Sequence, residues 1–276
     1  MNLNRSAKLT PKLIWVDNTG STNTDLVSMA GATDLPEFTV LATANQTSGR
    51  GRSGRVWQAP AGASLAISVL LKPDPKAPES LGWLPLLAGL AMAQNVGTLL
   101  PNTKVGVKWP NDVLVAEVKG VEQGAERKIS GVLTELVPRP VAGATFAVVV
   151  GAGINVTLAH QDLPVPTATS LQLSGAMLGE DETERLDLVL SGYLERLWHH
   201  YSRFRDSGFD AEASGLRNVI KDNCVSLNRE VRAVLPGDSE KVGWATDIDA
   251  DGRLKLQVLG QSFAMAAGDI VHLRHN

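Results

Sequence analysis

The sequence predicts an α+β protein, in which a mixed sheet with helices on one side is followed by a small β-barrel. Short β-branched and aliphatic runs, mostly joined by short turns, recur through the first half of the chain. Only two helical patterns fall between these runs, too few for a strictly alternating βαβ array. A long amphipathic helix then separates this part from about fifty C-terminal residues of brief strands.

The first part of the chain supplies the predicted sheet. The two helical patterns cover Asn23–Ala30 and the uncharged stretch from Ser80 to Thr103. That stretch is long enough for a membrane span, but its Pro, Gly and Asn residues and its helical spacing of apolar residues favour a buried core helix, with Ser80 as a candidate N-cap. The six predicted strands are Phe38–Ala44, Leu65–Leu71, Val105–Trp109, Val113–Ala116, Ile129–Val137 and Phe146–Val156.

A third helix begins at Asp181 and carries apolar residues every three or four positions as far as Phe204. His199 and His200 lie in this helix, but adjacent positions do not share a face, so a metal-binding pair is not predicted. A shorter helix is expected around Asp210 to Ile220.

The C-terminal part is predicted to be a barrel of five short strands. Turn signals at Pro236-Gly237-Asp238 and at Asp251-Gly252 stand where hairpins require special backbone angles. We therefore expect a first domain over residues 1–222 and a barrel over residues 223–276. The five strands are Cys224–Val234, Val242–Ile248, Arg253–Leu259, Ser262–Ala266 and Ile270–Leu273.

Charge and cysteine content exclude several classes of protein. The net charge is −3, which argues against binding of nucleic acid or an anionic membrane by the whole surface. Cys224 is the only cysteine, which excludes an intramolecular disulfide and a zinc-thiolate cluster. The first twenty residues contain no apolar block of the kind found in a signal peptide. A cytoplasmic protein that does not associate with membranes is the expectation.

A loop rich in glycine and arginine lies between two predicted strands, from Gly49 to Arg55. Glycines let a backbone approach a ligand, and each guanidinium offers a planar fork for phosphate or carboxylate. The loop therefore predicts an anionic ligand. The alternatives are a solvated basic loop or an RNA-binding segment, although an RNA-binding segment usually repeats such a motif. Without ligand, repulsion between the arginines is expected to leave the loop mobile.

Four other segments are weaker signals on their own. Lys108-Trp109-Pro110-Asn111-Asp112 forms a turn that presents an acid and an amide, and Lys128 begins an apolar strand. Gly151-Ala152-Gly153 lacks the third glycine of a dinucleotide-binding fingerprint, because Val156 stands there, and instead predicts a strand that a ligand or backbone approaches closely. Ser21-Thr22-Asn23 stands at the start of a predicted helix.

Together these segments resemble the biotin protein ligases in order and spacing. The resemblance implies a catalytic domain like those of the class II synthetases, followed by an SH3-like barrel. It also implies that biotin is activated with ATP and Mg²⁺ as biotinyl-5′-AMP and then transferred to one lysine of a carboxylase carrier domain. The matching motifs are Ser21-Thr22-Asn23, the Gly49–Arg55 loop with Trp57, Lys108–Asp112, Lys128-Ile129-Ser130-Gly131 and Gly151–Asn155.

The resemblance also assigns roles to residues. Lys128, Arg52 and Asp112 are implied to be catalytic, with Asp112 near the attacking amine as orienter or base. No dedicated metal site is implied, although Asn155 could reach the Mg²⁺ that accompanies ATP. The implied binding residues for biotin and the nucleotide are Ser21, Thr22, Asn23, Gln46, Arg50, Gly51, Arg52, Arg55, Trp57, Lys128, Gly131, Gly153 and Asn155.

Two further expectations concern partners. Some family members carry a DNA-binding domain before the catalytic domain, but only twenty residues precede Ser21, so DNA binding is not expected. The carrier domain is the expected protein partner, and a monomer or weak homodimer is the expected assembly. Two other functions stay open: a lipoate or octanoate ligase or transferase of the same fold, and a non-catalytic module that binds anions or RNA.

Overall fold

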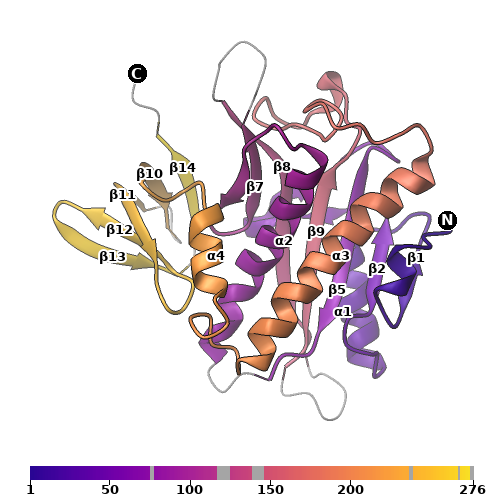
Figure 1. Cartoon of the computed structure of the whole chain (residues 1–276), viewed down its shortest axis with the longest axis horizontal. Coiled ribbons are helices and arrows are strands. Elements are labelled where there is room, and N and C mark those ends of the chain that lie inside the picture. The colour runs from indigo at the N-terminus through magenta and orange to yellow at the C-terminus, as the bar shows by residue number, and fades with distance from the viewer. Residues whose placement is uncertain (75–77, 117–124, 139–145, 236–238, 267, 274–276) are drawn as a thin grey trace.

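A seven-stranded mixed sheet forms the centre of the first part of the molecule (Figure 1). The computed structural model describes residues 1–276 except 75–77, 117–124, 139–145, 236–238, 267 and 274–276. β1 pairs with β2 in parallel and all other neighbours are antiparallel, so the predicted α+β class is confirmed. In spatial order the strands are β1 (Leu13–Trp15), β2 (Val40–Thr43), β5 (Ser64–Leu71), β9 (Val148–Asn155), β8 (Glu126–Leu136), β7 (Asp112–Ala116) and β6 (Val105–Lys108).

Helices cover both faces of this sheet, which corrects the prediction that they lie on one side. α2 (Leu84–Leu99) and α3 (Glu182–Asp206) share one apolar cluster with the sheet. α1 (Thr22–Ala32) packs in a separate cluster with alternate residues of the same strands. β5 is buried along its whole length, and a strand buried on both faces reads as a continuous apolar run. The sequence of the strands therefore did not reveal the second helix layer.

The helix boundaries differ from the prediction in two places. α2 begins at Leu84 after a 3₁₀ turn over Pro78–Trp83 and has no side-chain cap, so Ser80 is not its N-cap. α4 spans Leu216–Asn223, because the Asp210 carboxylate accepts from two backbone N–H groups and closes a turn instead of starting the helix. The start of α3 is as predicted, with Asp181 accepting from the Glu184 N–H. Among the described residues, no helix is both long and apolar enough to cross a membrane.

The Gly49–Arg55 loop has a regular structure that its sequence did not predict. β3 (Gly49–Arg50) and β4 (Val56–Trp57) pair as a short hairpin around a 3₁₀ turn over Arg52–Gly54. Two-residue strands are too short to show a periodicity, and this is also why the three-residue β1 was missed.

A five-stranded antiparallel sheet forms the C-terminal part. Gly252 has φ +79° in the turn after Asp251, as the sequence predicted, while Pro236-Gly237-Asp238 lies outside the described residues. The domain boundary after residue 222 stays a prediction. The strands, in spatial order, are β13 (Gln261–Met265), β12 (Leu254–Val258), β11 (Glu240–Ile248), β10 (Arg229–Val234) and β14 (Asp269–His272).

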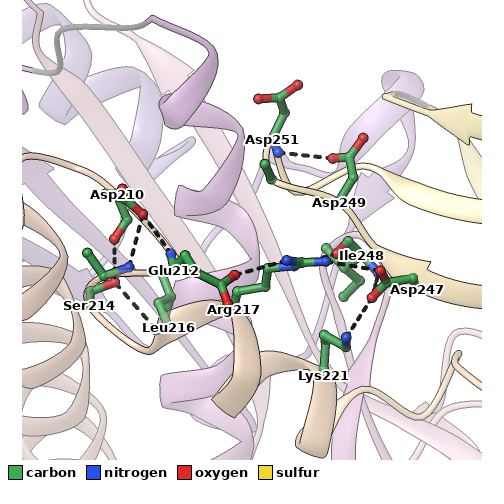
Figure 2. A network of polar contacts seen from close by, with 12 residues as sticks. Asp210, Glu212, Ser214, Leu216, Arg217, Lys221, Asp247, Ile248, Asp249 and Asp251 are labelled. Carbon is green, nitrogen blue, oxygen red and sulfur yellow. Dashed lines mark hydrogen bonds and ion pairs between the residues drawn. The ribbon is translucent and has the colours of Figure 1, made fainter.

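Polar contacts fix the C-terminal sheet against the first part of the molecule. Figure 2 shows Arg217 and Lys221 of α4 directed at Asp247 of β11, at 3.0 and 2.8 Å. On the side nearer the large sheet, the indole N–H of Trp109 donates to the Gly252 carbonyl at 3.0 Å. The C-terminal sheet is thereby placed next to the Lys108–Asp112 turn.

Candidate active site

A cavity of about 560 Å³ opens on the α1 face of the large sheet. Its floor is made of small residues from β5, β8 and β9: Ala66, Gly131, Gly151 and Gly153. The start of α1, the β3–β4 hairpin, the start of β7 and the end of β14 form its walls. All thirteen residues implied by the resemblance to bind ligand line this cavity, and so does Asp112.

The two glycines of β9 are positions that other side chains approach closely. A Cβ on Gly151 would lie 2.2 Å from Asn23 Oδ1, and one on Gly153 would lie 2.5 Å from Trp57 Cε2. The strand is closely approached, but by side chains of the cavity wall, whereas the sequence predicted a ligand or backbone. These glycines therefore make room for Asn23 and Trp57 above the strand.

The start of α1 presents a cluster of uncharged polar groups. Ser21 is its N-cap and accepts from the Thr24 N–H. Gln46 Oε1 accepts from the Thr22 N–H at 2.9 Å and from the Thr22 hydroxyl at 3.2 Å. The structure therefore brings Ser21, Thr22 and Gln46 to one end of the cavity, beside Asn23.

Asn23 is held in one orientation by three hydrogen-bond partners. Its Nδ2 donates to the Leu133 carbonyl at 3.1 Å and to Glu135 Oε2 at 2.8 Å, which uses both hydrogens. The hydroxyl of Ser68, a fully buried residue of β5, donates to Asn23 Oδ1 at 2.6 Å. Sequence reasoning missed both Ser68 and Glu135. For Ser68 the sequence signal is a polar side chain within a largely apolar strand, whereas Glu135 lies in a strand of mixed polar and apolar residues and has no such signal.

The arginines of the Gly49–Arg55 loop are paired with carboxylates on two sides. Arg50 Nη2 lies 3.0 Å from Glu135 Oε1, and Arg55 Nη2 lies 2.5 Å from Asp269 Oδ2 on β14. Arg52 Nη1 lies 3.9 Å from Asp269 and 3.2 Å from Asn111 Oδ1. These carboxylates offset the repulsion between the arginines from which the mobility of the loop was predicted. Whether the loop is mobile without ligand stays a prediction.

Lys128 and Asp112 form an ion pair of 2.6 Å inside the cavity. The register of β6, β7 and β8 sets Asp112 between Lys108 and Gly131. Burial lowers the pKa of Lys108, with nearby Lys128 acting in the same direction and Asp112 opposing both. The sequence assigns no role to Lys108, because the Lys108–Asp112 segment alone predicts only a turn that presents an acid and an amide.

Trp57 lies at the centre of the cavity wall. Lys128 Nζ is 5.8 Å from the centre of its ring, a distance that permits a cation–π contact. The indole Nε1 is buried and has no hydrogen-bond partner among the described residues. A buried indole donor without a partner is costly, so this N–H is well placed to donate to a ligand.

Asn155 and the far wall complete the cavity. Asn155 is 4 % exposed, and its Nδ2 donates to the Thr169 carbonyl at 2.9 Å. This bond turns the acceptor atom of the amide, Oδ1, away from Thr169. Glu126 of β8 and His272 of β14 also line the cavity and are joined by a 2.8 Å contact, which the sequence did not reveal.

Cys224 is buried and does not line the cavity, and its burial raises the pKa of the thiol. An acyl-thioester mechanism through this cysteine is therefore not supported.

Comparison with known proteins decides the family. Residues 15–155 match the model of the biotin/lipoate A/B protein ligase family, and residues 226–273 match the biotin protein ligase C-terminal domain. This chain belongs to the biotin/lipoate A/B protein ligase family. The cavity described above lies mostly on the segment that matches the family model.

Individual members of the biotin/lipoate A/B protein ligase family are similar over most of this chain. The biotin–[acetyl-CoA-carboxylase] ligase of Mycobacterium tuberculosis is 37% identical over 94% of this chain and 88% of its own length. The bifunctional ligase/repressor BirA of Escherichia coli is 29% identical over 91% of this chain and 70% of its own length. The structure of the Aquifex aeolicus biotin protein ligase in complex with biotin and ATP matches with a TM-score of 0.69 and 26% identity, over 96% of this chain and 100% of that one.

Proposed function

We propose that this chain is a biotin–[biotin carboxyl-carrier protein] ligase. It would join the biotin carboxylate to AMP from ATP, release pyrophosphate, and then transfer biotin from the adenylate to a lysine of a carrier domain. The observation that carries the proposal is a single cavity with an uncharged polar end at Ser21–Asn23 and a cationic end at Arg52 and Lys128. Those two ends suit a ligand with a neutral polar head and an anionic tail.

The uncharged end fits the ureido group of biotin, which has two N–H donors and one carbonyl acceptor. Because Ser68 and Glu135 fix the amide of Asn23, its Oδ1 is the atom directed toward Gly151 and can accept from a ureido N–H. The hydroxyl of Ser21 accepts at its oxygen from the Thr24 N–H and keeps its own hydrogen to donate to the ureido carbonyl.

The cationic end answers the main difficulty of the first step, which is to bring a carboxylate against the α-phosphate of ATP. Lys128 is placed to contact both anions, and Arg52 supplies a second positive group from the hairpin. Such fixed cations stabilise the negative charge that develops on the phosphoryl oxygens. The proton-free carboxylate oxygen forms the new P–O bond, and pyrophosphate takes the electrons of the bond that breaks.

Mg²⁺ is expected to enter with ATP. Among the described residues, no three His, Cys, Asp or Glu side chains are grouped so as to hold a metal ion. Mg²⁺ often takes most of its ligands from phosphate and water with one or two protein oxygens, and Oδ1 of Asn155, whose Nδ2 is bound to Thr169, fits that limited role.

In the second step the ε-amine of the carrier lysine attacks the carbonyl of the adenylate and AMP leaves. Asp112 is the carboxylate of the cavity that can receive a hydrogen bond from this amine, either to orient it or to accept its proton. Its ion pair with Lys128 must loosen when Lys128 turns to the ligand, which would free Asp112 for the amine. We further propose that this reaction takes place in the cytoplasm, with the protein as a monomer or weak homodimer.

The test is exchange of labelled pyrophosphate into ATP with biotin, lipoate, octanoate or no acid added. Biotin alone should support fast exchange. Exchange with lipoate or octanoate in preference to biotin would reassign the substrate. No exchange with any acid, together with RNA binding that weakens steeply with salt, would favour a non-catalytic module.

A further inference from the structure

We propose that Glu135 is a positioning residue that couples the two ends of this site. One carboxylate holds both Asn23, at the proposed biotin end, and Arg50, on the proposed phosphate-binding loop. The inference deepens the function proposed above and rests on it. It concerns a residue that does not itself line the cavity.

The geometry gives each carboxylate oxygen a different task. Oε2 accepts from Asn23 Nδ2 at 2.8 Å, and Oε1 accepts from Arg50 Nη2 at 3.0 Å. The donors come from α1 and from β3, which are also joined by the hydrogen bond from Arg50 Nη2 to Thr24 Oγ1. Glu135 projects from β8 and its side chain is 27 % exposed, so solvent screens these contacts only in part.

Hydrogen-bond accounting shows why Asn23 depends on Glu135. Nδ2 has two hydrogens, one for the Leu133 carbonyl and one for Glu135. Without the carboxylate, one hydrogen of a residue that is 5 % exposed loses its partner. The amide would then gain by turning toward other acceptors, and Oδ1 would no longer be fixed toward the cavity.

Glu135 orients Arg50 and leaves part of its guanidinium available to a ligand. Its Nη2 donates both hydrogens, one to Glu135 and one to Thr24 Oγ1 at 2.9 Å. A guanidinium has three further N–H groups, on Nε and Nη1. Among the described residues these have no hydrogen-bond partner, so they can contact a phosphate while Nη2 stays bound to Glu135.

A shared carboxylate makes the two ligands cooperate. Biotin bound at Asn23 Oδ1 would hold the amide more tightly in the orientation that Ser68 and Glu135 already favour, and would thereby hold Glu135 and Arg50 in position for the nucleotide. Coupling between two binding sites is reciprocal, so the nucleotide should raise the affinity for biotin by the same factor as biotin raises the affinity for the nucleotide.

Two substitutions separate the contacts. In Glu135→Gln the single amide oxygen can still accept a hydrogen bond from Asn23. The new NH₂ group, however, faces the guanidinium of Arg50, and two donors cannot form a hydrogen bond with each other. In Glu135→Ala both contacts are lost. The matched control is Glu240→Gln, which changes a half-exposed carboxylate of the C-terminal sheet that is paired with Arg232.

The experiment measures calorimetric affinities for biotin and for a non-hydrolysable ATP analogue, each alone and with the other present. Glu135→Ala should lower the affinity for biotin about tenfold, as expected when one buried donor loses its partner. It should also abolish the increase in affinity that each ligand causes for the other. Glu135→Gln should bind biotin alone almost normally but lose the enhancement. Wild-type affinities and enhancement in both variants would overturn the proposal.

Trypsin cleavage of the loop without ligand separates this inference from the proposed function. Release of Arg50 should make both Glu135 variants more rapidly cleaved within Gly49–Arg55 than the wild type and the Glu240→Gln control. If the wild-type chain binds no biotin, the proposed function is wrong. The cleavage rates would still show whether Glu135 holds the loop. Unchanged cleavage in both variants would show that Glu135 does not hold the loop.

Discussion

At the scale of single residues, the site depends on charges that neutralise one another until a ligand arrives. Lys128 is paired with Asp112, Arg50 with Glu135, and Arg55 with Asp269. At Lys128 an anionic ligand can replace the carboxylate of Asp112, and at Arg50 it can bind beside Glu135, so binding need not take a bare charge out of water. We therefore expect removal of a single cation to affect one step of the reaction more than the other.

Replacement of Lys128 by alanine should reduce biotin-dependent pyrophosphate exchange by about 10³-fold, because a fixed cation at the reacting oxygens is lost. Transfer from added biotinyl-5′-AMP should fall much less, since the activated phosphate is already made. Lys241→Ala, on the C-terminal sheet, is the control. Near-normal exchange in Lys128→Ala would remove this residue from the first step.

Replacement of Arg52 by glycine should release the activated intermediate. Arg52 bridges Asn111 and Asp269, so it links the hairpin to the wall of the cavity and to β14. Its loss should open the cavity, and escaped adenylate should label lysines of an unrelated protein such as albumin. Labelling is measured by mass spectrometry, and retention equal to that of the wild type would contradict this role.

The sequence revealed the residues of this site that stand in dense motifs, and the structure gathers them in one cavity. It assigned no role to Lys108 and did not reveal Ser68, Glu135 or Asp269. Each of the last three acts through a partner far along the chain: Glu135, for example, is 112 residues from Asn23. Local patterns carry no information about such contacts, which depend on strand register.

At the scale of elements, β9 shows how a strand can form a core and a binding floor at once. Val148, Val150 and Ala152 pack toward α2 and α3, while Gly151 and Gly153 make room on the opposite face for Asn23 and Trp57 of the cavity wall. The apolar run predicted the strand, and the glycines predicted a close approach. The helix of α1 was predicted, but its position on the second face was not predictable, because fully buried strands lose the alternation that distinguishes one face from the other.

Gly151→Ala should weaken biotin binding and destabilise the fold. Its Cβ would meet Asn23 Oδ1 at 2.2 Å, and Ser68 and Glu135 prevent a simple movement of that side chain. A loss of about 1–3 kcal/mol in the free energy of unfolding is expected from overpacking. The control Gly97→Ala, in α2 with open space around it, should be neutral or slightly stabilising. Urea denaturation and calorimetry measure both effects, and wild-type behaviour of Gly151→Ala would contradict the account.

At the scale of the whole molecule, the C-terminal sheet contributes directly to the cavity. Asp269 and His272 of β14 face the first part of the chain, where His272 Nδ1 lies 2.8 Å from Glu126 and Nε2 lies 3.1 Å from the Ser226 hydroxyl. The Ser226 hydroxyl accepts a hydrogen bond from the backbone N–H of Trp109. A chain of contacts therefore joins β8, the C-terminal sheet and the Lys108–Asp112 turn.

This junction predicts a dependence of stability on pH. Burial lowers the pKa of His272, although its contact with Glu126 opposes the shift. The unfolded chain therefore binds this proton more readily, and the free energy of unfolding should fall as the pH drops below the usual histidine value of about 6.5. His200, whose pKa burial lowers to about 4, adds a contribution of the same sign.

Urea denaturation of the wild type, His272→Gln and His200→Gln between about pH 5 and 7.5 tests this dependence. Each substitution should make the free energy of unfolding fall less steeply as the pH is lowered. An unchanged slope in His272→Gln would mean that burial of this ring does not contribute.

The most direct measurement of the central claim is detection of the reaction's two products by mass spectrometry. The purified protein with biotin, ATP and Mg²⁺ should form biotinyl-5′-AMP, and addition of a biotin carboxyl carrier domain should convert this to AMP and a carrier modified at one lysine. Lys128→Ala should form neither product at a comparable rate. Absence of the adenylate from the wild-type reaction, or equal adenylate formation by Lys128→Ala, would contradict the account.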